Sequence, residues 1–205
     1  MSTSPGISIQ RTWSCHCGCV QAKLLNDSTP GCFRCHCHSC VAAAKYIAKA
    51  TDDKPSMIPM LHADGGACVS PYAAENVEFT TGLSDTDGNS MLKFVKVGEE
   101  GSAWRCSTTC CGTQMTNCVF PGWIAFNRNG IKNEDGSKYD PEIINVFKSC
   151  SFDPKSVPEP SHETLPDGWF DVFMTKATGS TKLKDLYPEL FPKEADITDI
   201  VPITW

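Results

Sequence analysis

Hydrophobic and polar positions alternate in several short stretches of the chain, and residues typical of turns separate these stretches. Residues 20–24 follow the pattern closely, and residues 8–13 follow it loosely. Alternation with a period of two predicts strands with one buried and one exposed face. On similar grounds, strands are expected in the following further stretches: 32–37, 76–81, 91–97, 103–107, 115–120, 123–127 and 142–147.

Other parts of the chain depart from this pattern. Residues 41–50 are rich in alanine and lysine, which favour helix, and are predicted to form one short helix. Residues 51–76 are rich in proline, glycine, aspartate and methionine without periodicity, so a long loop insertion is expected there. Residues 1–8 are predicted to be a flexible leader, and the acidic, aromatic residues 150–205 a C-terminal extension packed on the domain. Residues 1–205 are thus predicted to form a single, mainly β domain with long loops.

The length and charge of the chain limit its class. Its 205 residues are enough to bury a core within one domain. The formal net charge of −6 argues against nucleic acid or an anionic membrane as the main partner. No stretch approaches the ~18 apolar residues that span a bilayer, and the first residues lack the charged and apolar regions of a secretion signal. We therefore expect a cytoplasmic protein, and the sequence leaves its oligomeric state open.

Cysteine is the most unusual component of the sequence. Seven of the 13 cysteines lie between Cys15 and Cys40, and an odd count excludes complete intramolecular pairing. A second group lies far downstream and consists of Cys106, Cys110, Cys111 and Cys118. Closely spaced cysteines in a reducing compartment predict metal binding. Redox chemistry, or disulfides in a secreted form, are the alternatives.

The spacing of the cysteines suits a metal ion. Alternate side chains of a strand point to the same side, so Cys15 and Cys17 can present two thiolates to one point. Cys35 and Cys37 can do the same, and Cys40 follows three residues later. Zinc favours thiolates in tetrahedral geometry. Four protein ligands make a structural zinc site, whereas three leave a position for water or substrate.

Three short motifs also resemble those of a known family. They are Cys15-His16-Cys17-Gly18-x-Val20, then Cys35-His36-Cys37-x-x-Cys40, and then Arg105 with Cys111-Gly112-Thr113, followed by Pro121-Gly122. These motifs resemble the glutathione-dependent formaldehyde-activating enzyme family, also called the CENP-V/GFA domain. The resemblance covers about residues 9–130. It implies a zinc-containing β fold of the Mss4-like kind with two zinc ions, one structural and one catalytic.

For the structural zinc, the resemblance implies that Cys15 and Cys17 join two downstream cysteines. The family pattern of Cys-x-x-Cys-Gly after the arginine would place one of these at position 108, which is a threonine in this chain. Either Cys106 or Cys110 therefore joins Cys111, or the structural site is altered. Cys106 shares a strand face with position 108, whereas Cys110 would point elsewhere if its segment were extended. We therefore prefer Cys106 with Cys111.

For the catalytic zinc, the resemblance implies Cys35, Cys37 and Cys40. The family's named reaction adds glutathione to formaldehyde to give S-hydroxymethylglutathione. The resemblance thus implies a carbon–sulfur lyase whose small-molecule substrate is a glutathione or other thiol adduct, or a small electrophile of specialised metabolism. A dehydration or elimination is a variant of this chemistry. Residues 42–45 differ from the Thr-Gly that the family tends to carry there, so a different substrate pocket is expected.

Two other interpretations of the cysteines compete with this one. Cys35, Cys37 and Cys40 form a structural zinc site if His36 or His38 supplies a fourth ligand, although in a strand both histidines face away from the cysteines. The chain would then be a non-catalytic zinc module that binds a protein partner, since fold alone does not fix function. A redox protein would instead cycle a thiol pair without metal.

Overall fold

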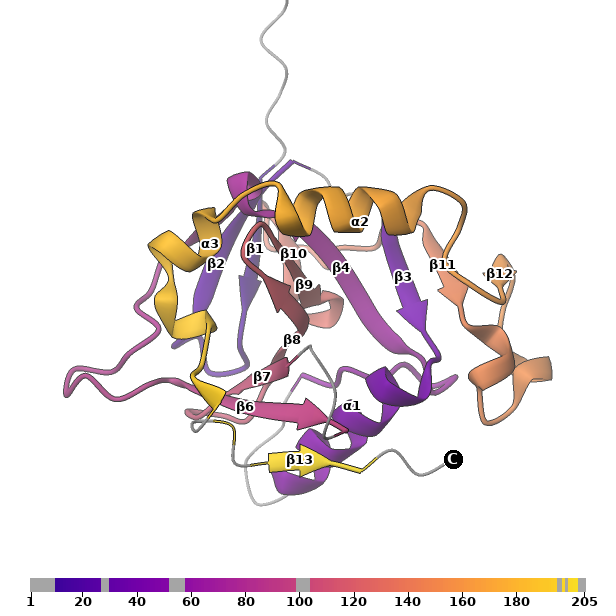
Figure 1. Cartoon of the computed structure of the whole chain (residues 1–205), viewed down its shortest axis with the longest axis horizontal. Coiled ribbons are helices and arrows are strands. Elements are labelled where there is room, and N and C mark those ends of the chain that lie inside the picture. The colour runs from indigo at the N-terminus through magenta and orange to yellow at the C-terminus, as the bar shows by residue number, and fades with distance from the viewer. Residues whose placement is uncertain are drawn as a thin grey trace, which may run out of the picture.

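The computed structural model describes residues 10–26, 30–51, 58–98, 104–194, 197 and 199–202, and its fold is mainly β (Figure 1). The expected leader at residues 1–8 lies outside the described residues. Every predicted strand stretch contains a strand. The strands are β1 Gln10–Ser14, β2 Gln21–Leu25, β3 Cys32–Cys35, β4 Ala67–Ala73, β5 Val77–Phe79, β6 Leu92–Val97, β7 Trp104–Thr108, β8 Gln114–Phe120, β9 Trp123–Asn127, β10 Ile131–Asn133, β11 Ile143–Val146, β12 Ser161–His162 and β13 Asp199–Val201.

The strands form two sheets. The smaller sheet has the order β10-β1-β2-β5 and is antiparallel, and the larger has the order β12-β11-β3-β4-β9-β8-β7-β6-β13. In the larger sheet β11 pairs in parallel with β3 and β12, and β13 pairs in parallel with β6. The other pairs, from β3 through β6, are antiparallel. The central strands of this sheet thus have neighbours on both sides.

The main hydrophobic core lies between the two sheets. Trp13 and Leu24 of the smaller sheet and Tyr72 and Phe126 of the larger sheet are fully buried in it. The ring centroids of Trp13 and Phe126 are 5.7 Å apart. The Trp13 indole N–H donates to the backbone oxygen of Asn127 at 3.0 Å. Each large apolar side chain buried in this way contributes about 1.5–3 kcal/mol, so this core fixes how the sheets face each other.

The other face of the larger sheet is covered by two helices, α1 (His38–Ala50) and α2 (Trp169–Thr178). Figure 1 shows α2 in orange along one end of the sheet and α1 in purple at the other. Ile47 of α1 packs against Val95 of β6 and Val201 of β13. The helix predicted at residues 41–50 begins three residues earlier in the structure, at His38. A shorter helix, α3 (Lys182–Leu186), and five 3₁₀ turns complete the elements: η1 Ala74–Asn76, η2 Arg128–Gly130, η3 Lys148–Cys150, η4 Pro154–Ser156 and η5 Pro188–Leu190.

The prediction of a loop insertion at residues 51–76 is wrong for Ala67–Ala73. These residues form strand β4 in the middle of the larger sheet. All seven residues of β4 are buried, because one face meets the smaller sheet and the other meets the helices. Such a strand shows no alternation of hydrophobic and polar residues. It also contains Pro71, which argues against a central strand when only the sequence is known. Residues 52–57 lie outside the described part.

The described part of the C-terminal stretch 150–205 packs on the larger sheet at several points. The Phe173 ring of α2 lies 5.0 Å from that of Trp123 and 6.0 Å from that of Phe33. The Trp104 indole N–H donates to the backbone oxygen of Leu190 at 3.0 Å. At the far edge, β13 extends the sheet beyond β6. These contacts bury aromatic residues whose pattern in the sequence predicts neither a helix nor a strand.

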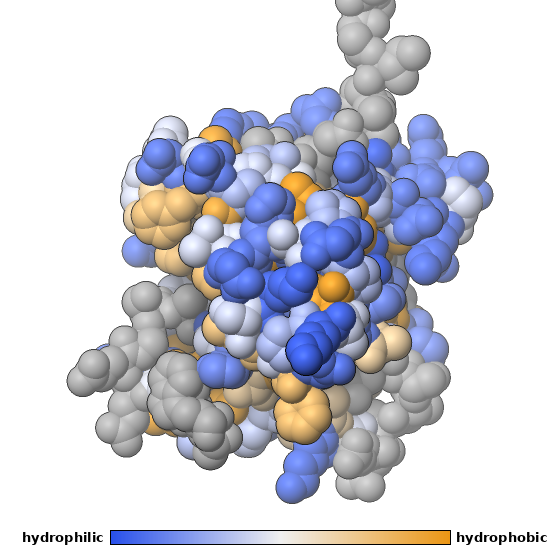
Figure 2. Space-filling model, turned by 90° about the vertical axis from the view of Figure 1, so that its right-hand side faces the viewer, coloured by the Kyte–Doolittle hydropathy of each residue, from blue (hydrophilic) through white to orange (hydrophobic). Residues whose placement is uncertain are grey.

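The surface over β11 and β12 is mainly hydrophilic, with scattered hydrophobic side chains (Figure 2). None of the helices among the described residues is both long and apolar enough to cross a membrane.

Candidate metal centres

Four thiols from two distant turns meet at one point, which we call the four-thiol cluster. Its members are Cys15, Cys17, Cys110 and Cys111, whose sulfur atoms all lie within 4.8 Å of one another. Cys17 Sγ is 3.3 Å from Cys110 Sγ and 3.6 Å from Cys15 Sγ. Zinc–sulfur bonds of about 2.3 Å in a tetrahedron place the sulfurs about 3.8 Å apart. The donor set and its spacing therefore fit zinc.

Tight turns present these sulfurs. Between β1 and β2, the Cys15 and Val20 backbones pair through a 3.0 Å hydrogen bond, and the Val20 N–H also donates to Cys15 Sγ at 3.3 Å. Gly18 has a φ of +80° in this turn, a value that glycine adopts without strain. Between β7 and β8, Gly112 has a φ of +68°, and a Cβ at this position would collide with Thr51. Both turns thus depend on their glycine.

Hydroxyl groups support the sulfur of Cys111. Thr113 Oγ1 lies 3.2 Å and Thr108 Oγ1 3.4 Å from Cys111 Sγ. Burial alone opposes ionisation, but the hydrogen bonds with Thr108 and Thr113 lower the pKa of Cys111 to about 5. Thr113 Oγ1 also accepts from the His16 N–H at 3.1 Å, which joins the two turns.

Cys106, which we expected beside Cys111, lies elsewhere, and Cys110 takes the place in the cluster. Cys106 is fully buried in the core between the sheets, with its Sγ 3.3 Å from Thr116 Oγ1, and burial raises its pKa to about 12. The expectation assumed that the segment before Cys111 is extended. It is a turn instead, closed by a hydrogen bond from the Gly112 N–H to the Thr108 oxygen. In that turn the adjacent Cys110 and Cys111 both reach the first pair.

Three further thiols form a second group, the three-thiol cluster. Its members are Cys35 at the end of β3, Cys37 just before α1 and Cys40 in the first turn of α1. Cys37 Sγ lies 3.3 Å from Cys35 Sγ and 3.2 Å from Cys40 Sγ. Cys35 and Cys40 are buried, and Cys37 is half-buried. This group is local in sequence, because the step from strand to helix brings its members together.

The surroundings of the three-thiol cluster favour a thiolate at Cys40. Hydrogen bonds with Cys35 and Cys37 lower the pKa of Cys40 well below its usual value. The positive charge of Arg105 and a 3.0 Å hydrogen bond from Asn117 Nδ2 act in the same direction. The buried Arg105 also donates to Ser39 Oγ at 2.8 Å, which fixes it beside the start of α1. A helix N-terminus likewise stabilises negative charge.

Neither nearby histidine belongs to the three-thiol cluster. His36 is buried, and its Nε2 lies 3.3 Å from Asn145 Oδ1 on β11. Among the residues that the structure describes, no histidine, carboxylate or further cysteine lies close enough to all three thiols to share a metal ion with them. A metal ion held here would have three protein ligands, whereas one in the four-thiol cluster would have four.

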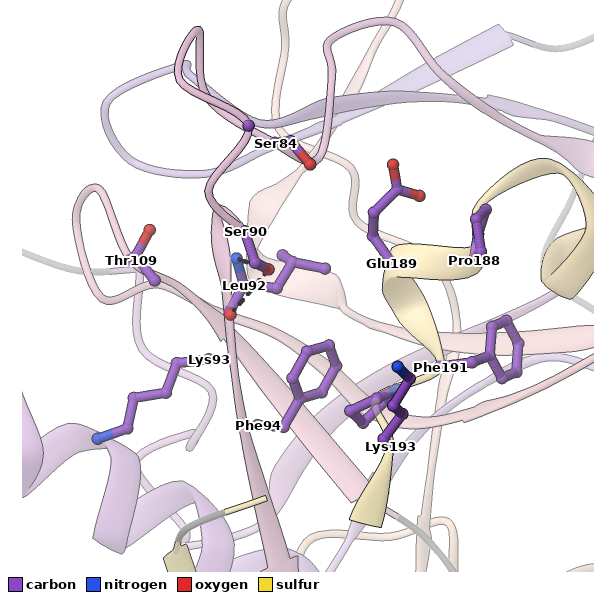
Figure 3. A pocket seen from close by; sticks show the side chains of 12 residues that line it. Ser84, Ser90, Leu92, Lys93, Phe94, Thr109, Pro188, Glu189, Phe191 and Lys193 are labelled. Carbon is purple, nitrogen blue, oxygen red and sulfur yellow. Dashed lines mark hydrogen bonds between the residues drawn. The ribbon is translucent and has the colours of Figure 1, made fainter. Parts of the chain in front are cut away.

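A cavity of about 330 Å³ lies beside the start of α1. Its lining includes His36 and His38, which flank Cys37, together with Lys45 of α1 and Cys150. A larger cavity, of about 620 Å³, lies between β6 and η5 (Figure 3). No cysteine lines this second cavity, in which Phe94, Lys193 and Glu189 face the space. A third cavity, of about 180 Å³, is lined by Thr108 and Gly112, which flank Cys110 and Cys111 in the chain, so each cluster has a cavity near it.

All 13 cysteines lie in the described part of the chain, and each is a free thiol. The closest sulfurs are 3.2 Å apart, well beyond the ~2.05 Å of a disulfide bond.

No protein-family model matches the chain, and no curated protein matches it significantly. The structure supports the coarser part of the resemblance, a mainly β chain with two cysteine clusters able to hold metal ions. Sequence reasoning missed Asn117, which lies in no motif, and it treated position 108 only as a place where the family pattern has a cysteine. Thr113 does lie in a motif, but only the structure assigns it a contact.

Proposed function

We propose that this protein is a zinc-dependent lyase that forms or breaks a carbon–sulfur bond in a thiol adduct of a small electrophile. The substrate class includes adducts of glutathione. The simplest such reaction is the reversible addition of a thiol to a carbonyl compound. A carbon–sulfur bond forms, and the thiol proton is transferred to the carbonyl oxygen, so no oxidant or reductant is needed. The proposed fold relationship is to the Mss4-like zinc proteins.

The observation that carries this proposal is the difference between the two clusters. Four thiols can saturate a tetrahedral zinc, which is typical of structural sites, whereas three leave a coordination position for a substrate. A cavity lined by His36 and His38, the neighbours of Cys37 in the chain, lies beside the three-thiol cluster. Zinc bound there would act as a Lewis acid that lowers the pKa of a thiol or polarises a carbonyl.

The side chains around the three-thiol cluster support a role in substrate binding. Lys45 and His38 line the cavity and offer donors to a polar or anionic substrate. Arg105 stabilises the Cys40 thiolate by its charge and, through Ser39, holds the first turn of α1. Cys35 and Cys40 are shielded from water by their burial, which strengthens electrostatic interactions at the site.

The proposal is tested by metal analysis combined with an assay for adduct formation. The wild-type protein is expected to hold two zinc ions per chain. Replacement of that zinc by cobalt(II) should give a visible spectrum that changes when a thiol is added. Nuclear magnetic resonance of mixtures of glutathione and small aldehydes then reports formation of the adduct. One zinc per chain, or a cobalt spectrum indifferent to every thiol, would contradict the proposal.

Two serine variants separate the roles of the clusters. Cys37→Ser should abolish turnover and the thiol-dependent spectral change while the fold is kept. Cys17→Ser should instead impair folding, because structural zinc binding is coupled to folding. If Cys37→Ser retains full turnover, the three-thiol cluster is not the reaction site. A non-catalytic zinc module would show two zinc ions without any turnover or exchangeable ligand.

A further inference from the structure

Asn117 occupies a special position in strand β8. In the pairing with β9, Thr116 lies opposite Phe126 and Cys118 opposite Ala125, so Asn117 is one extra residue in β8. Such a β-bulge redirects the side chains that follow it, and bulges are frequent next to active sites. Thr116 faces the core between the sheets, whereas Cys118 packs on the helix-covered face. The bulge thus turns β8 toward α1 at this residue.

Only one of the two polar atoms of the Asn117 side-chain amide has a hydrogen-bond partner among the described residues. Its Nδ2 donates to Cys40 Sγ at 3.0 Å, and the side chain is 4% exposed. Its Oδ1 is buried and has no hydrogen-bond partner among the described residues. A buried acceptor without a partner is uncommon in native proteins and calls for an explanation. The same amide group therefore places a free acceptor beside the three-thiol cluster.

The chemistry of Cys40 fixes which end of the amide faces the sulfur. The structure has Asn117 Nδ2 facing Cys40 Sγ at 3.0 Å, and a cysteine sulfur that binds a metal ion carries no proton and can only accept a hydrogen bond. The carbonyl end must then point away from Cys40 Sγ while staying buried near the cluster. An O–H group bound beside the three thiols is a suitable partner for it. The product of thiol addition to a carbonyl compound carries such a hydroxyl on the carbon attached to sulfur.

We infer that Asn117 is a positioning residue of the three-thiol cluster with two tasks. Its Nδ2 holds the Cys40 thiolate in place, and its Oδ1 accepts a hydrogen bond from a hydroxyl close to the sulfur of the substrate. This role rests on the proposed function and makes it more specific. Substrates of the site are hydroxyl-bearing thioethers or thiols, as opposed to purely alkyl ones.

The first test measures zinc affinity of the full-length chain by competition with a coloured chelator. Asn117→Leu removes the hydrogen-bond donor at nearly constant side-chain volume. It should lower the affinity for one of the two zinc ions about 10- to 100-fold. Asn127→Leu is the matched control, since Asn127 is a fully buried asparagine of the same sheet whose Nδ2 bonds only backbone oxygens. It should leave both affinities unchanged. Asn117→Ala carries the same test if the leucine variant does not fold.

The second test examines the acceptor with two matched thiols and the cobalt(II)-loaded protein. 2-Mercaptoethanol and 1-propanethiol differ only in a hydroxyl against a methyl group. The preference for 2-mercaptoethanol over 1-propanethiol is measured as the ratio of their dissociation constants. This preference should be about five times larger in the wild type than in Asn117→Leu, as expected for one hydrogen bond. Asn127→Leu should keep the wild-type ratio.

The outcomes separate this inference from the proposed function. A wild-type protein with one zinc per chain overturns the proposed function and this role with it. A wild-type protein with two zinc ions and a thiol-sensitive spectrum supports the proposed function. If Asn117→Leu then keeps both zinc affinities and the wild-type thiol ratio, only the role of Asn117 is overturned.

Discussion

Cys17 Sγ lies 3.3 Å from Cys110 Sγ, although 93 residues separate the two cysteines in the chain. Cys17 lies in the turn between β1 and β2, which belong to the smaller sheet, and Cys110 in the turn between β7 and β8 of the larger sheet. A metal ion in the four-thiol cluster therefore links the two sheets at the border of their hydrophobic core, to which Cys15 and Cys111 belong. Four predictions follow from this arrangement and its surroundings.

Cys110→Ser is expected to remove zinc from the four-thiol cluster and to lower the free energy of unfolding by more than about 3 kcal/mol. The loss is large because the metal no longer links the two sheets. Zinc content by elemental analysis and chemical denaturation provide the measurements.

Cys106→Ser is the control for this variant, because Cys106 was the alternative ligand. Its buried hydroxyl can keep the hydrogen bond with Thr116, so the expected cost is within about 1 kcal/mol and zinc content should stay unchanged. Loss of a zinc ion from Cys106→Ser, with Cys110→Ser unaffected, would show that the wrong cysteine has been assigned.

A limiting amount of chelator should remove zinc in two stages. The three-thiol cluster offers fewer protein ligands, so its zinc is expected to leave first, with little change in the circular dichroism or the melting temperature. Removal of the second zinc should lower the melting temperature markedly, because that ion links distant turns. Zinc content and melting curves are recorded on the same samples. Unfolding that accompanies the first zinc ion would contradict the proposed division between the clusters.

Phe173→Ala is expected to destabilise the protein by about 2–4 kcal/mol, because its ring packs against Trp123 and Phe33. Phe170 lies on the same helix but is 61% exposed, so Phe170→Ala should change stability by less than about 0.5 kcal/mol. Chemical denaturation of both variants measures the difference. Equal costs would mean that α2 does not belong to the folded domain through this aromatic contact.

Gly112→Ala is expected to cost more than Gly136→Ala. Both glycines have positive φ, which costs an alanine about 1 kcal/mol, but only at Gly112 would the new Cβ collide with the Thr51 side chain. The extra strain falls on the turn that carries Cys110 and Cys111, so zinc content should fall in Gly112→Ala alone. The two variants are compared by thermal unfolding and elemental analysis. A similar loss of zinc in Gly136→Ala would contradict a local effect.

The fold was predictable where one face of a strand meets solvent or a partly polar layer. The stretch at residues 20–24 alternates, and β2 follows it because Ala22 and Leu24 face the core while Lys23 is exposed. Strand β4 was missed since both of its faces are covered. The second helix was missed because its aromatic residues contact several distant strands, and such contacts leave no regular local pattern.

The three-thiol cluster was apparent in the sequence, because Cys35, Cys37 and Cys40 are close enough in the chain for local geometry to bring their sulfurs together. Asn117 was not, since it reaches Cys40 through a bulge whose position depends on the pairing of β8 with β9. A bulge has no residue signature of its own that separates it from a regular strand.

The sequence by itself determined that the chain is mainly β and that its cysteines fall into two separated groups with metal-binding spacing. Periodicity and short-range spacing carry this information, because both act within a few residues. Only the tertiary structure decided that Cys110 joins Cys15, Cys17 and Cys111 while Cys106 faces the core. The reason is that a turn closed by Gly112 changes the direction of side chains that an extended strand would have sent to opposite sides.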